Sequence, residues 1–325
     1  MQHPYENLGP EVILNAIDST GLLTSGHLTA LNSYENRVYQ VGIEGENPLI
    51  AKFYRPERWS DKSILQEHAF AMALVEDELP VIAPLEINGD TLFHYQGFRF
   101  ALFPRKGGQG GHLEQDEDFR QMGRFLARMH QIGQEVNASA RPHLNPQTYG
   151  HDSRAVVLQS GMLPPDLIPA YDTISRDCLN LIDEIWREHS PHLQLIHGDM
   201  HAGNILWRDE SFHLVDLDDC CLGPRMQDIF MLLNGETDQQ QRQLEVLAEA
   251  YMQFMPFPAQ QLALIESLRT LRILKYAAWI CQRWHDPAFP IAFPWFGQGR
   301  FWPDHILSLR EQFAALQGPS LQLYL

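Results

Sequence analysis

The sequence HGDMHAGN at residues 197–204 is the most informative stretch of this chain. It follows a mostly apolar run, Leu193 to Ile196, which is typical of a short strand. Twelve residues after Asn204, Asp216 follows a second predicted strand, residues 212–215. Two strand ends of this kind can bring the acidic and amide side chains of both segments to one rim of a fold. The pattern therefore predicts a site made of two carboxylates and one amide.

The spacing His-x-Asp-x-x-x-x-Asn is that of the catalytic loop of kinases. Phosphoryl transfer needs one carboxylate that orients the acceptor hydroxyl and accepts its proton. It also needs an amide and a second carboxylate that hold the divalent metal bridging the nucleotide phosphates. On this hypothesis Asp199 is the base. Asn204 and Asp216 are the metal ligands, and Asp216 is also the second catalytic carboxylate.

Two other interpretations of this stretch are weaker. Asp and Asn are common in turns, so each residue alone carries little information. A metal-dependent hydrolase could instead use His197, Asp199 and His201 as ligands, because alternate residues of a strand point the same way. That hypothesis leaves Asn204 and Asp216 without a role, and no second His cluster with ligand spacing occurs in the sequence.

Lys52 is the central charge of an otherwise apolar predicted strand, residues 49–54. A buried lysine is costly unless an anion meets it. In kinases such a lysine contacts the nucleotide phosphates and is held by a glutamate from the next helix. Glu67 is the candidate, because it lies three residues after Ile64 and four before Ala71 on the apolar face of the predicted helix. The alternative is a lysine at a strand edge whose ammonium reaches solvent.

No G-x-G-x-x-G motif precedes Lys52. The polar segment Asn32–Asn36 takes its place between the expected first two strands. Ser33 and nearby backbone N–H groups could contact phosphate there, and an ordinary polar turn is an equally good interpretation.

Periodicity predicts an α+β chain with a small antiparallel-sheet lobe followed by a larger, mainly helical lobe, as in bilobal protein kinases. The boundary is expected within the glycine-rich segment 104–111. Residues 1–104 would contact the ATP phosphates and adenine, and residues 105–325 would hold the catalytic loop, metal site and acceptor site. The elements expected in the first lobe are helices at 10–19 and 61–76, the latter capped by Ser60, and strands at 38–43, 49–54, 80–87, 91–95 and 98–103.

Composition limits the classes of function. The 325 residues include 24 Lys and Arg against 41 Asp and Glu, a formal net charge of −17. This charge argues against a protein that gains affinity by neutralising nucleic-acid phosphates. No apolar stretch is long enough to cross a membrane, and the first residues lack the basic and apolar regions of a signal peptide. Four cysteines without CxxC spacing favour reduced thiols in a cytoplasmic protein.

Two features near the C-terminal part stay open. Cys220 and Cys221 follow the predicted metal ligand, where burial as small apolar residues is favoured over a redox switch. The aromatic-rich segment 279–302 could form a cage for a quaternary amine, although packing in the helical lobe is favoured.

The chain resembles the bacterial stress response kinase A family, within the aminoglycoside phosphotransferase and choline kinase superfamily. The resemblance runs from about residue 28 to near the C-terminus. It is carried by the segments 31–40, 52–59, 197–209, 215–219 and 283–290.

The resemblance implies a monomeric, cytoplasmic Ser/Thr protein kinase that uses ATP and Mg²⁺ and acts in the bacterial stress response. It places Ser33 at the ATP phosphates and Asp228 as a buried acceptor behind the catalytic loop. The implied partners are proteins with Ser or Thr hydroxyls, and neither nucleic acid nor membrane. Whether the chain also phosphorylates itself stays open. Asp216-Leu217-Asp218 replaces the D-F-G of eukaryotic kinases and no A-P-E follows, so a phosphorylated activation loop is not expected.

Two further classes of function stay open. A small-molecule kinase acting on an amino alcohol or aminoglycoside would use the same fold. A nonenzymatic nucleotide-binding module is disfavoured, because the Asp199, Asn204 and Asp216 set is complete.

Overall fold

The computed structural model describes residues 4–111, 113–208 and 211–324. These residues form two compact units that are each discontinuous in sequence. Leaving aside the residues that are not described, the first unit consists of Met1–His112, Ile132–Arg141 and His201–Cys220. The second unit consists of Leu113–Gln131, Pro142–Met200 and Cys221–Leu325. The functions predicted for residues 1–104 and 105–325 stay predictions.

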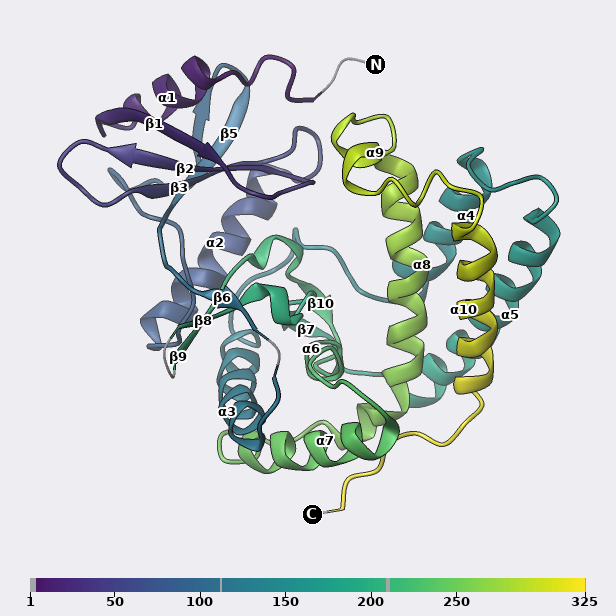
Figure 1. Cartoon of the computed structure of the whole chain (residues 1–325). Helices are drawn as coiled ribbons and strands as arrows, with labels where there is room; N and C mark the ends of the chain where they lie inside the picture. Colours follow the sequence, from purple (N-terminus) through teal and green to yellow (C-terminus); the bar gives the residue numbers. More distant parts are fainter. Residues whose placement is uncertain (1–3, 112, 209–210, 325) are drawn as a thin grey trace. The chain divides into compact units, whose positions relative to one another are not determined.

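The first unit contains an antiparallel sheet of five strands among its described residues, in the order β1-β2-β3-β5-β4. Strands β1, β2, β3 and β5 are labelled in Figure 1. The strands are β1 (Thr24–Ala30), β2 (Arg37–Ile43), β3 (Leu49–Phe53), β4 (Phe93–Tyr95) and β5 (Phe98–Pro104). The predicted hairpin is present, because β2 pairs with β3 and Val38 lies opposite Lys52. The strand predicted at 80–87 is wrong, since only single bridges occur at Val81 and Ile87 within the described chain. Pro80 and Pro84 lack the N–H groups that a strand ladder needs.

The two faces of this sheet carry different helices. Helix α1 (Pro10–Asp18) packs on the face that includes Phe100 and Leu102. Helix α2 (Asp61–Glu76) contributes Ile64 to a separate cluster with Ala101. Successive strand side chains point to opposite faces, and Lys52 is paired with Ala101 in the register. Lys52 therefore points to the face that α2 covers.

A smaller antiparallel sheet of the first unit has the order β6-β8-β9. Its strands are β6 (Gln109–Gly110), β8 (Ile205–Arg208) and β9 (Ser211–Leu214). Short helical turns at Ala202–Asn204 and Leu217–Asp219 lie immediately before β8 and soon after β9. The predicted linker thus contains a paired strand, and the strand predicted at 212–215 is present one residue earlier.

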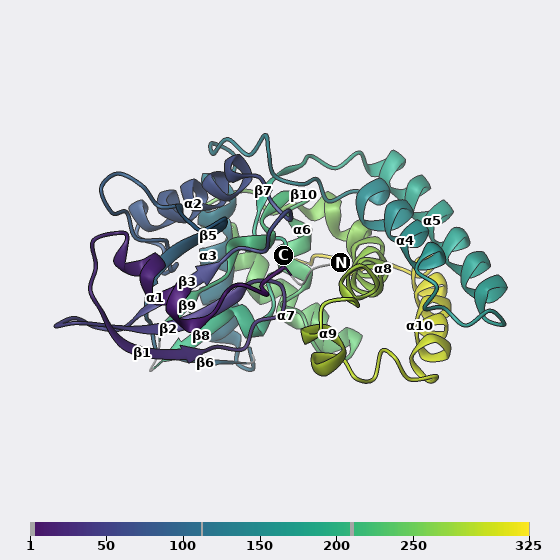
Figure 2. The ribbon, with the colours of Figure 1, turned by 90° about the horizontal axis from the view of Figure 1, so that it is seen from above.

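The second unit is mainly helical. Its α-helices are α3 (Asp116–Ile132), α4 (Asp152–Gln159), α5 (Ile168–His189), α6 (Met226–Phe230), α7 (Thr237–Tyr251), α8 (Ile265–Arg283), α9 (Ala288–Ala292) and α10 (Phe301–Ala315). Short helical turns occupy Pro146–His151 and Ala259–Leu264. Strand β7 (Gln194–Ile196) pairs with β10 (Cys221–Gly223). Helices α4 and α5 and helices α8 and α10 lie side by side within this unit (Figures 1 and 2).

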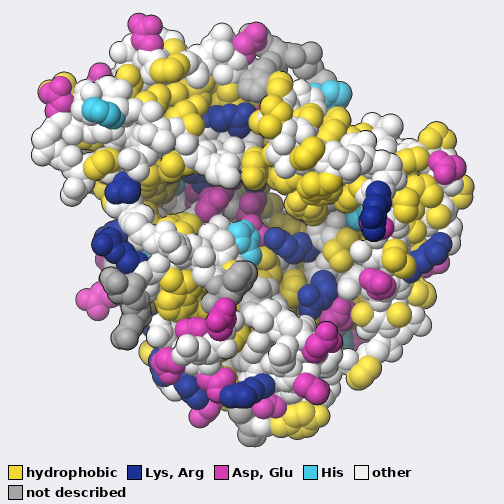
Figure 3. Space-filling model, in the orientation of Figure 1, with side chains coloured by type: hydrophobic (Ala, Val, Ile, Leu, Met, Phe, Trp, Pro, Cys, Tyr) yellow, Lys and Arg dark blue, Asp and Glu magenta, His cyan; other side chains and the backbone are white. Residues whose placement is uncertain are grey.

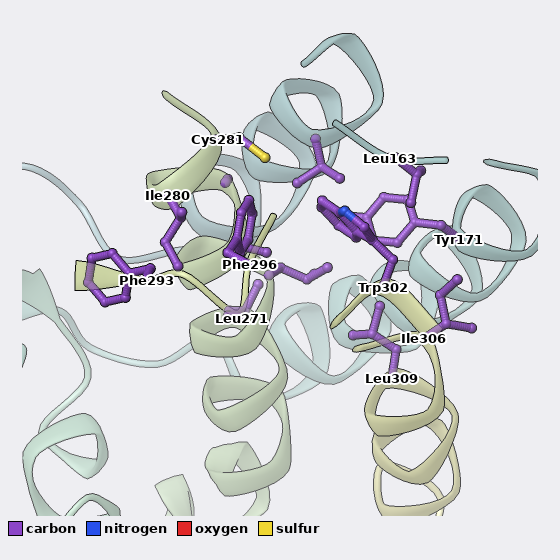
Figure 4. Packing of buried hydrophobic residues seen from close by; sticks show 14 of the residues in the cluster. Leu163, Tyr171, Leu271, Ile280, Cys281, Phe293, Phe296, Trp302, Ile306 and Leu309 are labelled. Carbon is purple, nitrogen blue, oxygen red and sulfur yellow. The ribbon is translucent and has the colours of Figure 1, made fainter. Parts of the chain in front are cut away.

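The core of the second unit explains most of the aromatic-rich segment. Phe293, Phe296 and Trp302 are buried with Tyr171 and apolar residues of α5, α8 and α10 (Figure 4). Phe289 belongs to the same buried cluster. The rings of Phe296 and Trp302 meet edge to face at 5.4 Å between centroids, a geometry that favours aromatic packing. The packing interpretation of this segment is therefore confirmed for its buried members.

The described helices include none with both the length and the apolar composition that a membrane crossing requires. On the face shown in Figure 3, basic and acidic side chains are interspersed, without one continuous basic surface.

Candidate active site

Lys52 lies in the first unit among three carboxylates. Its Nζ is 3.2 Å from Glu67 Oε1, 3.2 Å from Asp216 Oδ1 and 3.1 Å from Asp218 Oδ1. The side chains of Lys52, Glu67 and Asp218 are less than a tenth exposed, whereas that of Asp216 is 55% exposed. The contact between Lys52 and Glu67 is thus present, while a role for either residue in nucleotide binding stays a prediction. The strand-edge alternative is wrong, because the ammonium is buried.

Burial and charge act in opposite directions on this cluster. Burial lowers the pKa of Lys52, but Asp218, Glu67 and Asp216 more than compensate, so its pKa lies well above the ordinary value. Burial raises the pKa of Glu67 to about 7 in spite of the charge of Lys52. Burial also disfavours the charged form of Asp218, yet Arg58, Lys52 and Arg141 hold its pKa well below its ordinary range. Lys52 is therefore charged, and Glu67 is a weaker acid than Asp218.

Two arginines that sequence reasoning missed complete the cluster. Arg58 contacts the carboxylates of Asp218 and Asp219. Arg141 donates from Nε to the carbonyl of Cys220 at 2.8 Å and from Nη2 to that of Asp218 at 2.5 Å. Both arginines fix the backbone and side chains directly after Asp216. Sequence separations of up to 161 residues hide such contacts from local patterns.

The backbone brings the two predicted metal ligands together. The N–H of Val215 donates to the carbonyl of Asn204 at 2.9 Å, and Ile205 is paired with Leu214 in the sheet register. Asn204 ends one helical turn, and Asp216 immediately precedes the other. Asp216 has a φ of +61°, a conformation uncommon outside glycine and often kept at functional sites.

Ser33 lies in the loop between β1 and β2. Its Oγ accepts from the N–H of Val38 at 3.1 Å and lies 3.4 Å from the carbonyl of Leu31. Nearby, Asn36 is buried and its Oδ1 accepts from the N–H of Arg55 at 3.1 Å. These bonds shape the loop and are compatible with both an ordinary polar turn and a phosphate loop, so the role of Ser33 stays a prediction.

Asp199 belongs to the second unit, where its loop is fixed through the backbone. The fully buried carboxylate of Asp228 accepts from the N–H of His197 at 2.9 Å and from the N–H of Gly198 at 2.8 Å. His130 Nε2 lies 3.1 Å from Asp228 Oδ2, and Gln227 Nε2 donates to the carbonyl of Gly198 at 3.0 Å. Asp228 is thus a buried acceptor for this loop, as expected. His130 is a packed, hydrogen-bonded residue, and burial lowers its pKa.

Arg272 of α8 is a further residue that sequence reasoning missed. Its Nη1 lies 2.5 Å from Asp199 Oδ1. The Asp199 side chain is 25% exposed and the Arg272 side chain 43% exposed. No motif links α8 to the loop that contains Asp199, so this pair could not be found from spacing.

The two histidines of the hydrolase alternative are engaged in their own turns. The buried His197 ring accepts at Nδ1 from the N–H of Asp199 at 3.2 Å. In the first unit, His201 Nδ1 accepts from the N–H of Gly203 at 2.9 Å. Both rings therefore help to shape the loop.

The cysteines next to the cluster are buried. Cys220 and Cys221 have no exposed surface, and burial raises the pKa of the Cys220 thiol to about 12. A thiol with so high a pKa is a poor nucleophile, which agrees with packing rather than redox switching.

Comparison with known proteins identifies the family. The phosphotransferase enzyme family model matches residues 27–262. Stress response kinase A of Escherichia coli O157:H7 is 43% identical over 319 residues, which cover 98% of this chain and 97% of the relative. A relative from Salmonella typhimurium named serine/threonine protein kinase RdoA is 42% identical over the same extent.

Solved structures share the fold. A microcompartment-associated aminopropanol kinase has a TM-score of 0.70 at 19% identity and covers 94% of this chain and 96% of its own. The amicoumacin kinase hAmiN, solved with AMP-PNP, Ca²⁺ and Ami, has a TM-score of 0.69 at 18% identity, with coverages of 92% and 90%. At these identities the likeness concerns the α+β, kinase-like fold alone. Matches over nearly the whole length show that this chain is a phosphotransferase, a member of the phosphotransferase enzyme family that groups with the stress response kinase A relatives.

Proposed function

We propose that this chain is an ATP- and Mg²⁺-dependent Ser/Thr protein kinase of the bacterial stress response that acts in the cytoplasm as a monomer. The observation that carries the proposal is the near full-length similarity to relatives with protein kinase and stress response kinase names. The buried cluster around Lys52 supports the ATP part of the proposal, because a lysine paired with a helix glutamate is the phosphate-binding arrangement of protein kinases.

The residues of the first unit fit a divalent cation. The ammonium of Lys52 faces three carboxylates within 3.2 Å. Because Arg58 and Arg141 belong to the same cluster, its charges nearly balance, and the fit rests on the exposed carboxylate of Asp216. Asp216 is half exposed and lies beside Asn204 through the backbone bond of Val215. Carboxylate and amide oxygens are the ligands that Mg²⁺ prefers. Asn204 and Asp216 would hold the metal, which would neutralise charge on the ATP phosphates during transfer.

The protein groups would divide the chemistry as follows. Lys52 would bind the phosphates, with Glu67 and Asp218 holding its ammonium in place, and Ser33 would add a contact from the loop before β2. Asp199 would orient the acceptor hydroxyl and accept its proton as the oxygen attacks the γ-phosphorus in line, while the bond from that phosphorus to the bridging oxygen breaks and ADP leaves. Asp228 would keep the loop of Asp199 in shape through the N–H groups of His197 and Gly198.

The proposal is tested by incubating the purified chain with γ-labelled ATP and Mg²⁺, alone and with three kinds of acceptor: a protein mixture, amino alcohols and aminoglycosides. The Asp199→Ala variant runs in parallel. Label on protein with wild type and none with the variant is the expected result. Label on a small molecule alone would replace the proposal by a small-molecule kinase, and nucleotide binding without any transfer would point to a binding module.

A further inference from the structure

The contact between Arg272 and Asp199 places a positive charge on the acceptor side of the proposed reaction. The guanidinium has five N–H donors, and its Nη1 lies 2.5 Å from Asp199 Oδ1. Among the described residues, Asp199 is the one acid that Arg272 contacts. With 43% of its side chain exposed, Arg272 keeps further donors accessible beside the carboxylate that would orient the acceptor.

A second cation lies one helical turn further along α8. Lys275 follows Arg272 by three residues, so both lie on one helix face. Lys275 Nζ is 5.2 Å from the centroid of the Tyr149 ring, a cation–π contact. Like charges at this spacing destabilise a helix slightly. The stability of α8 therefore does not explain why Arg272 and Lys275 lie side by side.

The preceding turn of the same helix shows the contrast. Arg269 is 3.2 Å from its own acid, Glu266, within α8, and its guanidinium lies 5.3 Å from the centroid of the Phe230 ring. Arg269 is thus held by an intrahelical ion pair and a ring. Arg272 has instead the proposed catalytic carboxylate as its partner.

We propose that Arg272, assisted by Lys275, binds an anionic group of the acceptor next to the hydroxyl that Asp199 orients. This deepens the proposed function and rests on it. The preferred acceptor is then a Ser or Thr in a protein segment rich in Asp, Glu or phosphorylated side chains. The planar guanidinium can contact Asp199 and a carboxylate or phosphate of the acceptor at once, which a lysine ammonium does less well.

The same arrangement disfavours cationic acceptors. An amino alcohol or aminoglycoside brings ammonium groups, and these would meet Arg272 where a carboxylate would be needed. The net charge of −17 repels acidic segments at long range. Arg272 and Lys275 act at contact distance, where local charge outweighs a screened distant field.

The test uses one Ser-containing peptide made in three versions, with Glu, Gln or Lys on both sides of the acceptor. kcat/KM is measured with γ-labelled ATP and Mg²⁺ for the full chain and for Arg272→Gln, Arg272→Lys and the matched control Arg269→Gln. We expect the wild type to prefer the Glu peptide over the Lys peptide by at least about tenfold, which corresponds to ~1.4 kcal/mol. Arg272→Gln should abolish that preference, Arg272→Lys should retain part of it, and Arg269→Gln should keep it.

Two results would overturn the inference. An equal loss of kcat/KM on all three peptides in Arg272→Gln would make Arg272 a positioning residue for Asp199 without a role in selection. If Arg272→Gln kept the wild-type preference for the Glu peptide, the contact between Arg272 and Asp199 would be an ion pair without a role in selecting the acceptor. Thermal unfolding of each variant is the control for folding. A variant that loses the peptide preference but unfolds at the wild-type temperature has lost selection and not its fold, and Arg272→Lys is the charge-conserving comparison.

A binding measurement separates this inference from the proposed function. Fluorescence anisotropy of the labelled Glu peptide, without nucleotide, needs no turnover. If no peptide accepts label, the protein kinase proposal fails, whereas weaker binding to Arg272→Gln than to wild type still supports the anion site. Equal binding to both proteins, or a higher kcat/KM for amino alcohols than for the Glu peptide, would overturn the anion site.

Discussion

Asp216 and Asp199, the two carboxylates that the sequence predicts to act together, are held in different ways in their two units. Asp216 is held by side-chain charge, because Lys52 lies 3.2 Å from its Oδ1 within a cluster that also contains Glu67 and Asp218. The loop of Asp199 is held by backbone N–H groups that donate to the buried carboxylate of Asp228. Its own side chain contacts Arg272 of α8.

These two ways of holding a carboxylate indicate which residues serve function and which serve stability. Burying several charges costs more desolvation than their attraction returns in many proteins, so the cluster around Lys52 is best explained by a ligand that uses it. A buried carboxylate that satisfies backbone donors is a structural device, because unpaired buried N–H groups are costly. Variants of the first group should therefore change nucleotide-dependent activity, and variants of the second should change the fold.

The largest effect is expected for Asp228→Ala. The change leaves the N–H groups of His197 and Gly198 without their acceptor in a buried site, which should lower the free energy of unfolding by about 3–5 kcal/mol. Chemical denaturation of the variant measures the loss. Glu249→Ala, an exposed acid on α7, is the matched control and should stay within ~0.5 kcal/mol of wild type. A stable Asp228→Ala protein would contradict the structural role.

Lys52→Met should act mainly on activity. Removing the ammonium leaves Glu67, Asp216 and Asp218 without their shared cation and removes the proposed phosphate contact, so kcat/KM for ATP should fall roughly 100-fold. Lys62→Met, an exposed lysine on α2, should leave kcat/KM unchanged. Equal values for Lys52→Met and wild type would remove Lys52 from the site.

Gly123→Ala tests packing in the second unit without touching any charge. A Cβ at this position would lie 2.3 Å from the backbone carbonyl oxygen of Leu247, so α3 and α7 would have to separate. We expect a loss of about 1–3 kcal/mol in the free energy of unfolding. Gly299→Ala, where a Cβ meets no atom within 4 Å, should be close to neutral. Similar stabilities of the two variants would show that α3 and α7 can separate at little cost.

The effect that is smallest per step of the titration concerns pH, and it is expected in both units. Burial lowers the pKa of His68 in the first unit to about 3 and that of His305 in the second to about 4. An unfolded histidine titrates near ~6.5, so below that pH the unfolded chain binds more protons than the folded one. Stability from these groups is present above pH ~6.5 and is lost as pH falls through the folded pKa values, at up to ~1.4 kcal/mol per pH unit for each histidine.

His305→Phe keeps an aromatic ring beside Tyr171 and Phe301 but removes the titrating group. The slope of unfolding free energy against pH between about 4 and 6.5 should therefore be smaller than in wild type. An identical slope in the two proteins would show that His305 does not titrate on unfolding.

Much of the fold follows from local pattern, and the exceptions have physical reasons. The helix at 61–76 has the predicted bounds, because Ser60 caps it by accepting a hydrogen bond from the N–H of Ser63, only three residues away. The sequence does not give the bounds of strand β1 (Thr24–Ala30), since its side chains are mostly exposed and show no alternation. The strand expected at 80–87 is wrong because its prolines cannot join a ladder.

The candidate site divides in the same manner. The motif spacing predicts Asp199, Asn204 and Asp216, and helix periodicity predicts the partner of Lys52. Arg58, Arg141 and Arg272 could not be predicted, because each meets its partner across a long stretch of chain and an arginine by itself is common on surfaces. Only the fold shows which arginines contact the acidic groups.

The most direct test of the account compares two alanine variants, Asp199→Ala and Asp216→Ala, in one titration. The affinity for an ATP analogue is measured with and without Mg²⁺, and label transfer from ATP is measured on the same proteins. The account predicts that Asp199→Ala loses transfer and keeps wild-type affinity within about threefold, whereas Asp216→Ala loses Mg²⁺-dependent affinity by at least about tenfold. Wild-type transfer by Asp199→Ala, or undiminished Mg²⁺-dependent binding by Asp216→Ala, would contradict the division of roles between the two carboxylates.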